Sequence, residues 1–183
     1  MNEAAGSIYE RVLILRCQMG DEAALEELIA RYSAGLRRFL WKMIGQEAMA
    51  DDLLQETWVE VYRKINGLER PEAFGAWVYR IARDKAYREL RRRKAPGTIQ
   101  EVYDESMLSK DDDDGALALD DAEEVRVALA ALPGEQREVL VLRFIEEMSY
   151  EQIAEVIARP LGTVRSRIHY AKAALRAKLK ERR

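Results

Sequence analysis

The chain carries the sequence SYEQIAEVIARPLGTVRSR at residues 149–167, and this stretch decides how the carboxyl-terminal third folds. Ser149 and Gln152 have the spacing of a capping box, in which a hydroxyl and an amide close the start of a helix. Apolar residues follow at helical spacing, namely Ile153, Ala154 and Ile157. Pro160 interrupts the pattern, because proline lacks an amide donor and suits a first helical turn. The stretch therefore predicts a short helix, a tight turn and a second helix from Thr163 to Leu179.

The two sides of the second helix differ in polarity. At about 100° per residue its apolar residues form one stripe, which consists of Val164, Ile168, Ala171 and Leu175. Arg165, Ser166 and His169 lie roughly opposite, with Thr163 at the edge. Any surface helix has polar residues opposite its core stripe. The capped partner helix and the Pro-Gly turn nevertheless favour a helix-turn-helix that reads the DNA major groove, where arginine can donate two hydrogen bonds to a guanine.

The composition is that of a globular chain with few residues for catalytic or metal chemistry. Hydrophobic residues make up 48% of the 183 residues, which is enough for one medium or two small domains. The single cysteine, Cys17, excludes an internal disulfide and is expected to be a core thiol. With a single histidine, His169, no Cys/His zinc site can be assembled. We expect no cofactor and no enzymatic activity, and because neither a signal peptide nor a membrane span is evident, we expect a cytoplasmic protein.

The net charge of −3 conceals an uneven distribution. Residues 1–94 hold 17 basic and 15 acidic side chains, residues 95–124 hold one and 11, and residues 125–183 hold 12 and seven. The middle segment also contains Pro96, Gly97, Gly115 and an aspartate run at 111–114, and it lacks a sustained apolar period. We therefore predict an all-α protein with helical domains at 1–94 and 121–183, joined by a flexible acidic linker at 95–120.

The amino-terminal domain shows apolar repeats of helical spacing and no strand-like alternation. The expected helices lie near 8–18, 21–44, 48–66 and 71–93, with Asp21 as a cap and Pro71 in a first turn. On the third helix, we expect Leu54, Trp58, Val61, Tyr62 and Ile65 to be buried. Asp52, Leu53, Glu56 and Glu60 then lie on the far side, where a leucine among acids is either a docking patch or a single exposed leucine of the ordinary kind.

On the fourth helix, the apolar side consists of Phe74, Val78, Ile81, Ala82 and Ala86. Another side carries Arg80, Arg83, Tyr87, Arg91 and Lys94 at spacings of three and four. Cations beside a ring that can stack on an unpaired base suit the binding of partly single-stranded DNA. A solvated charged face is the alternative, although such faces usually alternate in sign.

Five motifs together resemble those of the extracytoplasmic-function (ECF) group of bacterial sigma factors. They are DDLLQETW at 51–58, FGAWVYRIAR at 74–83, LPGEQREVLVL at 132–142, SYEQIA at 149–154 and GTVRSR at 162–167. The resemblance implies a promoter-specificity subunit that binds core RNA polymerase and promoter DNA. It also suggests an anti-sigma factor or another regulatory partner, and it implies no catalytic chemistry.

Three sets of site residues follow from this resemblance. The polymerase contact falls on Asp52, Leu53, Gln55 and Glu56. The minus-ten element would be opened and read by the loop and helix that carry Asn66, Arg70, Arg80, Arg83, Tyr87 and Arg91. The minus-thirty-five element would be read as duplex by Arg159, Thr163, Arg165, Ser166, Arg167 and His169.

Two departures from the family pattern bear on these sites. Asp84 stands where the family commonly has asparagine, and its carboxylate repels phosphate unless Arg80 or Arg88, four residues away on either side, neutralises it. Ala158 and Arg159 replace the usual glycine and apolar pair in the turn, which leaves the turn geometry and a phosphate contact from Arg159 open.

Two questions stay open at the level of sequence. The first is whether the chain is instead a two-domain helix-turn-helix regulator that does not associate stably with polymerase. The outward acidic patch and the arginine stripe count against this alternative, because a sensor domain does not require them. The second is whether the acidic linker competes with DNA for the basic faces or serves only as a spacer.

Overall fold

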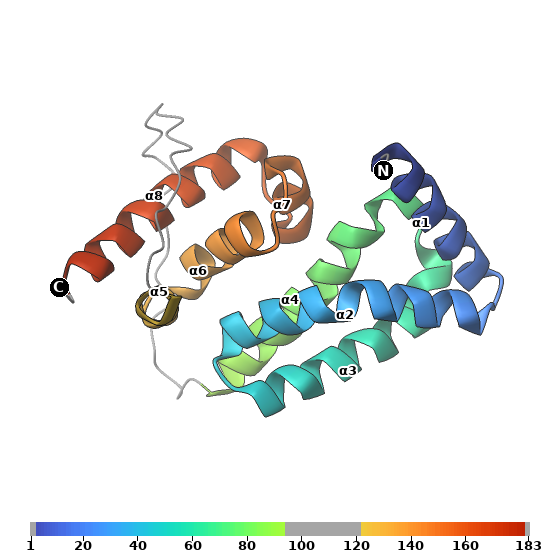
Figure 1. Cartoon of the computed structure of the whole chain (residues 1–183), viewed down its shortest axis with the longest axis horizontal. Helices are drawn as coiled ribbons and strands as arrows, with labels where there is room; N and C mark the ends of the chain where they lie inside the picture. The colour runs from blue at the N-terminus through green and yellow to red at the C-terminus, as the bar shows by residue number, and fades with distance from the viewer. Residues whose placement is uncertain (1–2, 94–121, 182–183) are drawn as a thin grey trace. The chain divides into compact units, whose positions relative to one another are not determined.

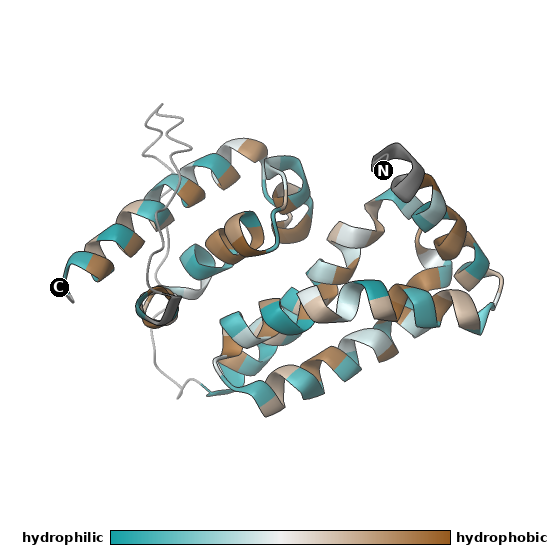
Figure 2. Cartoon of the chain, viewed as in Figure 1, coloured by the Kyte–Doolittle hydropathy of each residue, from teal (hydrophilic) through white to brown (hydrophobic). Residues whose placement is uncertain are grey.

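The computed structural model describes residues 3–93 and 122–181, which hold helices and no strand (Figure 1). The expectation of an all-α protein is confirmed. The chain divides into two compact units, Met1–Arg91 and Arg92–Arg183. The predicted acidic linker at 95–120 lies outside the described residues. The helices of both units carry both apolar and polar residues along their length, as expected for amphipathic helices (Figure 2).

The first unit contains α1 (Glu3–Gln18), α2 (Glu22–Ile44), α3 (Glu47–Lys64) and α4 (Phe74–Arg93). Two short 3₁₀ turns, η1 (Ile65–Gly67) and η2 (Pro71–Ala73), connect α3 to α4. Asp21 caps α2 as predicted, because its side chain accepts a hydrogen bond from the amide of Ala24. At the other end of α2, Gly45 adopts a left-handed conformation with φ of 77°, which glycine reaches without strain.

The core of the first unit is built around α2, which packs against both α1 and α3. Aromatic side chains connect α2 to α4: the rings of Phe39 and Tyr79 lie 5.6 Å apart, and those of Tyr32 and Phe74 lie 5.3 Å apart, both edge to face. The apolar side predicted for α4 is buried. Cys17 is also buried, as expected, and this burial raises the pKa of its thiol.

The buried stripe of α3 differs from the expected one. Leu53 is only 5% exposed, whereas Tyr62, which we expected in the core, is 63% exposed. The predictions of an outward Leu53 and an inward Tyr62 were therefore wrong. The reason is that α3 is covered from two directions: α2 packs along it, and Lys85 of α4 reaches it from another side. The buried arc thus turns towards Leu53 and Thr57, whose hydroxyl donates a 2.7 Å hydrogen bond to the Leu53 carbonyl.

The second unit contains α5 (Ala122–Ala130), α6 (Gly134–Leu140), a π-helical turn η3 (Val141–Ile145), α7 (Tyr150–Ile157) and α8 (Leu161–Lys180). Helices α5, α6 and α7 each pack against α8. Arg137 of α6 donates hydrogen bonds to the carbonyls of Leu129, Ala130 and Leu132, and so satisfies acceptors at the end of α5. The second unit is thus assembled around the long basic helix α8.

Candidate nucleic-acid and docking interfaces

The predicted basic face of α4 contains a stacked arginine and tyrosine. The Cζ atom of Arg83 lies 4.8 Å from the centre of the Tyr87 ring, within the range of a cation–π contact. Arg80 and Arg91 are exposed, and Arg83 and Tyr87 are half-buried. A planar cation on an aromatic ring, with further arginines along the helix, can bind phosphate and stack on a base.

Asp84 is held within this face by its immediate neighbour. An oxygen of the Asp84 carboxylate lies 3.3 Å from Nη1 of Arg83, so Arg83 contributes to the neutralisation that we had expected from Arg80 or Arg88. The side chain of Asp84 is 59% exposed and that of Arg83 is 21% exposed. One arginine therefore contacts both the acid and the ring, and this limits the freedom of its guanidinium.

The segment between α3 and α4 is fixed to α1. The side-chain amide of Gln18 donates hydrogen bonds of 2.9 and 2.8 Å to the carbonyls of Ile65 and Leu68. Asn66 and Arg70 are both exposed on this segment, and Arg70 lies 3.3 Å from the carboxylate of Glu72. A hydrogen bond from its own backbone amide, followed by one from Arg70, lowers the pKa of Glu72. The backbone of this loop is therefore held in one conformation by Gln18, and the loop presents polar side chains.

The outer face of α3 presents three of the four predicted docking residues. Asp52, Gln55 and Glu56 are exposed, and Leu53 is not. These three residues line an open groove together with Val59, Glu60, Arg63, Lys64 and Lys85. Val59 is 50% exposed and supplies an apolar side chain on this face, the kind of contact that we had expected from Leu53.

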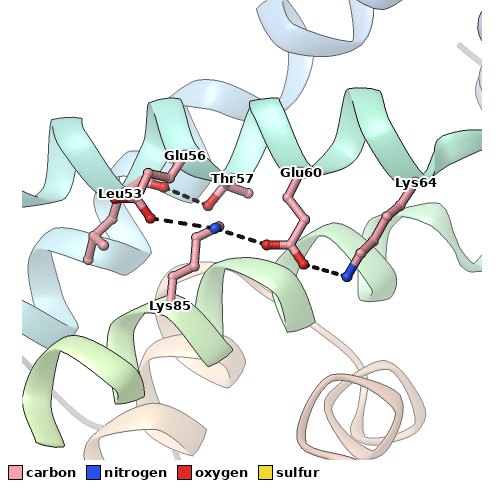
Figure 3. Close-up of polar contacts among 6 residues, drawn as sticks. All are labelled: Leu53, Glu56, Thr57, Glu60, Lys64 and Lys85. Atoms are coloured by element: carbon pink, nitrogen blue, oxygen red, sulfur yellow. Dashed lines mark hydrogen bonds and ion pairs between the residues drawn. The ribbon is translucent and has the colours of Figure 1, made fainter.

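A lysine from α4 reaches this groove from below the helix, as Figure 3 shows. Nζ of Lys85 lies 2.9 Å from a Glu60 carboxylate oxygen and 3.5 Å from one of Glu56. Lys64 contacts Glu60 at 2.7 Å. Hydrogen bonds from Lys64 and then Lys85 lower the pKa of Glu60 to about 2. We did not predict Lys85, although its place beside Ile81 and Ala82 on the apolar side of the helix was a detectable signal.

In the second unit, the predicted helix-turn-helix residues gather at the start of α8. The capping box of α7 is present: Ser149 and Gln152 exchange hydrogen bonds of 2.8 and 3.2 Å. The apolar stripe of α8 is buried as predicted. Arg165 is exposed, Thr163 and His169 are half-buried, and the Ser166 hydroxyl donates to the carbonyl of Thr163.

Arg167 differs from the other polar residues of α8. Its side chain is 12% exposed, and Nη2 lies 3.0 Å from a carboxylate oxygen of Glu135 on α6. This ion pair connects α8 to α6. A contact from Arg167 to DNA would therefore compete with its ion pair to Glu135. Arg165, in contrast, projects from the surface.

The turn between α7 and α8 contains a left-handed alanine. Ala158 has φ of 53° and ψ of 50°, the conformation that glycine adopts most easily. Arg159 follows it, is exposed, and donates its amide to the Ala154 carbonyl. Ala158 thus forms the turn that a glycine would form, at a cost in backbone strain.

Among residues 3–93 and 122–181, no group of three or more His, Cys, Asp or Glu side chains is arranged to hold a metal ion. Within the same residues, no helix has the length and apolar character needed to cross a membrane.

Sequence comparisons match both units to families. The family profile described as Sigma-70 region 2 matches residues 28–95, and that of Sigma-70, region 4, matches residues 122–175. The ECF RNA polymerase sigma-E factor of Haemophilus influenzae is 30% identical, over 96% of this chain and 97% of its own.

Solved structures show the same similarity. The structure of CnrH in complex with the cytosolic domain of CnrY matches with a TM-score of 0.73 and 26% identity, and covers 94% of this chain and 97% of CnrH. The sigma factor RpoE in complex with the anti-sigma factor NepR, from Bartonella quintana, matches with a TM-score of 0.65 and 27% identity, over 86% and 98%. Because both regions occur in order and a relative aligns along nearly its whole length, the chain belongs to the extracytoplasmic-function sigma factors and acts as an alternative sigma factor, which directs RNA polymerase to specific promoters.

Proposed function

We propose that this sigma factor divides promoter recognition between three helices. The outer face of α3 docks onto core polymerase, α4 with its preceding loop opens and reads the minus-ten element, and α8 reads the minus-thirty-five element as duplex. The observation that carries the proposal is the chemical difference between the arginine–tyrosine face of α4 and the projecting Arg165 of α8. We also propose that the protein acts in the cytoplasm and without enzymatic activity.

The docking face of α3 comprises Asp52, Gln55 and Glu56. Their exposed carboxylates and amide suit a basic partner surface, because charge-assisted hydrogen bonds to carboxylates are the strong ones. Leu53 supports this face from beneath, since it is buried. The half-exposed Val59 adds apolar area within the same groove.

The minus-ten surface comprises Asn66 and Arg70 in the loop and Arg80, Arg83, Tyr87 and Arg91 on α4. The arginines neutralise phosphates, and the Tyr87 ring is the platform on which an unstacked base can rest. The 4.8 Å contact with Arg83 orients this ring and supports the assignment.

The minus-thirty-five surface comprises Arg159, Thr163, Arg165, Ser166, Arg167 and His169. We assign the base contact to Arg165, because its exposed guanidinium can pair with a guanine in the major groove. We assign Arg167 a positioning role through Glu135, and we assign a phosphate contact to Arg159, which is exposed in the turn.

A regulatory partner is also proposed. The matching RpoE structure is a complex with an anti-sigma factor. We infer that a protein of this class binds the present chain and covers its polymerase-binding or DNA-binding surface.

The docking assignment can be tested by reversing charges on α3. The double variant Asp52→Lys, Glu56→Lys should lose binding to core polymerase and run-off transcription while its helical content is retained, because Lys85 keeps its closer ion pair with Glu60. The control is Glu22→Lys, Glu26→Lys, which reverses two exposed acids at the same spacing on α2. Unchanged core affinity of the α3 variant would refute the assignment.

A further inference from the structure

Lys85 is a charged residue in a position where a charge is costly. Its side chain is 8% exposed, and it lies on the apolar side of α4 among Ile81, Ala82 and Ala86. Burying an ammonium group is unfavourable unless carboxylates are paired with it. Both of its partners, Glu56 and Glu60, belong to α3, so Lys85 connects the DNA-binding helix to the docking helix (Figure 3).

The two carboxylates are not equivalent. Glu60 contacts both Lys64 at 2.7 Å and Lys85 at 2.9 Å, and its side chain is 26% exposed. Glu56 contacts Lys85 at 3.5 Å, and its side chain is 61% exposed. A carboxylate has about four lone-pair sites, so Glu56 keeps the capacity to accept a donor from a partner. Glu60 therefore holds Lys85 in place. Lys85 in turn holds Glu56, which lines the groove.

We propose that Lys85 is a positioning residue that holds Glu56 in the groove so that it can accept a cationic side chain, of the arginine type, from a basic surface of core polymerase. The inference rests on the proposed function of α3. An unrestrained glutamate would lose rotamer freedom on binding, and the contact with Lys85 removes part of this cost beforehand. Arginine fits because its planar fork can donate to the free oxygens of Glu56 and to the neighbouring Asp52.

The test is a double-mutant cycle on the affinity of the full-length protein for purified core RNA polymerase. Lys85→Met and Glu56→Gln should each weaken binding by roughly five- to tenfold, and the double variant should bind no more weakly than Glu56→Gln alone. Lys64→Met is the matched control: it removes another lysine that lines the groove and contacts Glu60, but not Glu56. This control should stay within about twofold of the parent, which is the range expected of an exposed ion pair.

Three results would overturn the inference. Additive losses in the cycle would show that Lys85 does not act through Glu56. Tighter binding by Lys85→Met would show that the lysine only reduces the negative charge of the groove. A lower melting temperature with unchanged affinity would assign Lys85 to the core of the fold alone. If Lys85→Met does not fold, Lys85→Gln, which keeps a polar donor, replaces it in the same cycle.

Asp52→Lys and Lys85→Met together separate the positioning role of Lys85 from the docking role of α3. If Asp52→Lys abolishes polymerase binding and Lys85→Met has no effect, α3 is the docking helix and Lys85 does not position Glu56. If neither substitution changes polymerase affinity, the docking assignment itself is wrong.

Discussion

Helices α4 and α8 are both 20 residues long and both carry arginines on the side away from their cores, yet they present these arginines differently. On α4, Arg83 is held between the ring of Tyr87 and the carboxylate of Asp84. On α8, Arg165 projects from the first turns of the helix, and the neighbouring Arg167 is occupied by Glu135. The same residue type is therefore restrained beside an aromatic ring in one unit and left exposed in the other.

This difference separates two ways of binding DNA. A cation that stacks on a ring offers a flat surface, which suits bases that have left the duplex. An arginine near the start of a helix can enter the major groove and read a base edge. If α4 and α8 are divided in this way, substitutions on the two helices should have separable effects on promoter opening and on base preference.

The largest effect is expected from removing the two arginines in turn. Arg165→Ala should cost about 1–3 kcal/mol of affinity for minus-thirty-five duplex and relax base preference at one position, because a bidentate contact is lost. Arg83→Ala should instead weaken promoter opening evenly across sequences. Permanganate footprinting and competition binding on matched promoters measure both. If Arg165→Ala leaves upstream base preference intact, α8 is not the sequence reader.

Removal of the ring on α4 comes next. Tyr87→Ala should weaken holoenzyme binding to single-stranded minus-ten DNA by an amount at the lower end of the roughly 1–3 kcal/mol of base stacking, because Arg83 already covers part of the ring. Tyr87→Phe keeps the ring and should retain most of the affinity. Fluorescence anisotropy with a minus-ten oligonucleotide provides the measurement. Equal losses for the two substitutions would assign the effect to the hydroxyl and not to stacking.

A smaller effect concerns the turn that orients α8. Ala158→Gly should stabilise the protein by up to about 1 kcal/mol, since a left-handed alanine costs roughly 1–2 kcal/mol and glycine gives back part of this gain as backbone entropy. Ala154→Gly, in the interior of α7, should have the opposite sign, because glycine is a poorer helix former than alanine. Thermal unfolding monitored by circular dichroism compares them. Destabilisation by Ala158→Gly would show that the backbone of Ala158 is not strained.

The smallest effect is expected at Asp84. Asp84→Asn removes a carboxylate that is 59% exposed and paired with Arg83, and should strengthen DNA binding by about twofold at low salt. The gain should shrink as salt approaches about 0.15 M, where the Debye length is near 8 Å. A salt series of nonspecific DNA binding checks this. A constant gain at all salt concentrations would point to a change in helix structure and not to charge.

Most of the helices could be predicted from sequence, because their signals are local. Asp21 and Ser149 mark helix starts by accepting a hydrogen bond from the amide three residues on, and Pro160 marks one through its fixed φ. The structure places the starts of α2, α7 and α8 there. The core stripes of α4 and α8 were also correct, since each has apolar residues on only one side. The first helix begins earlier than expected, at Glu3, and the last begins at Leu161.

By itself, then, the sequence determined the helical class, the caps, the tight turn before α8 and the presence of two sets of outward arginines. Only the tertiary structure decided that Leu53 is buried while Tyr62 is exposed. The reason is that α3 carries apolar residues in two adjacent stripes, and the packing of α2, with Lys85 of α4 on another side, selects between them. It also decided that Lys85 reaches Glu56 and that Arg167 meets Glu135. Such ion pairs join residues far apart in the chain, and their geometry depends on how whole helices dock, which no local spacing specifies.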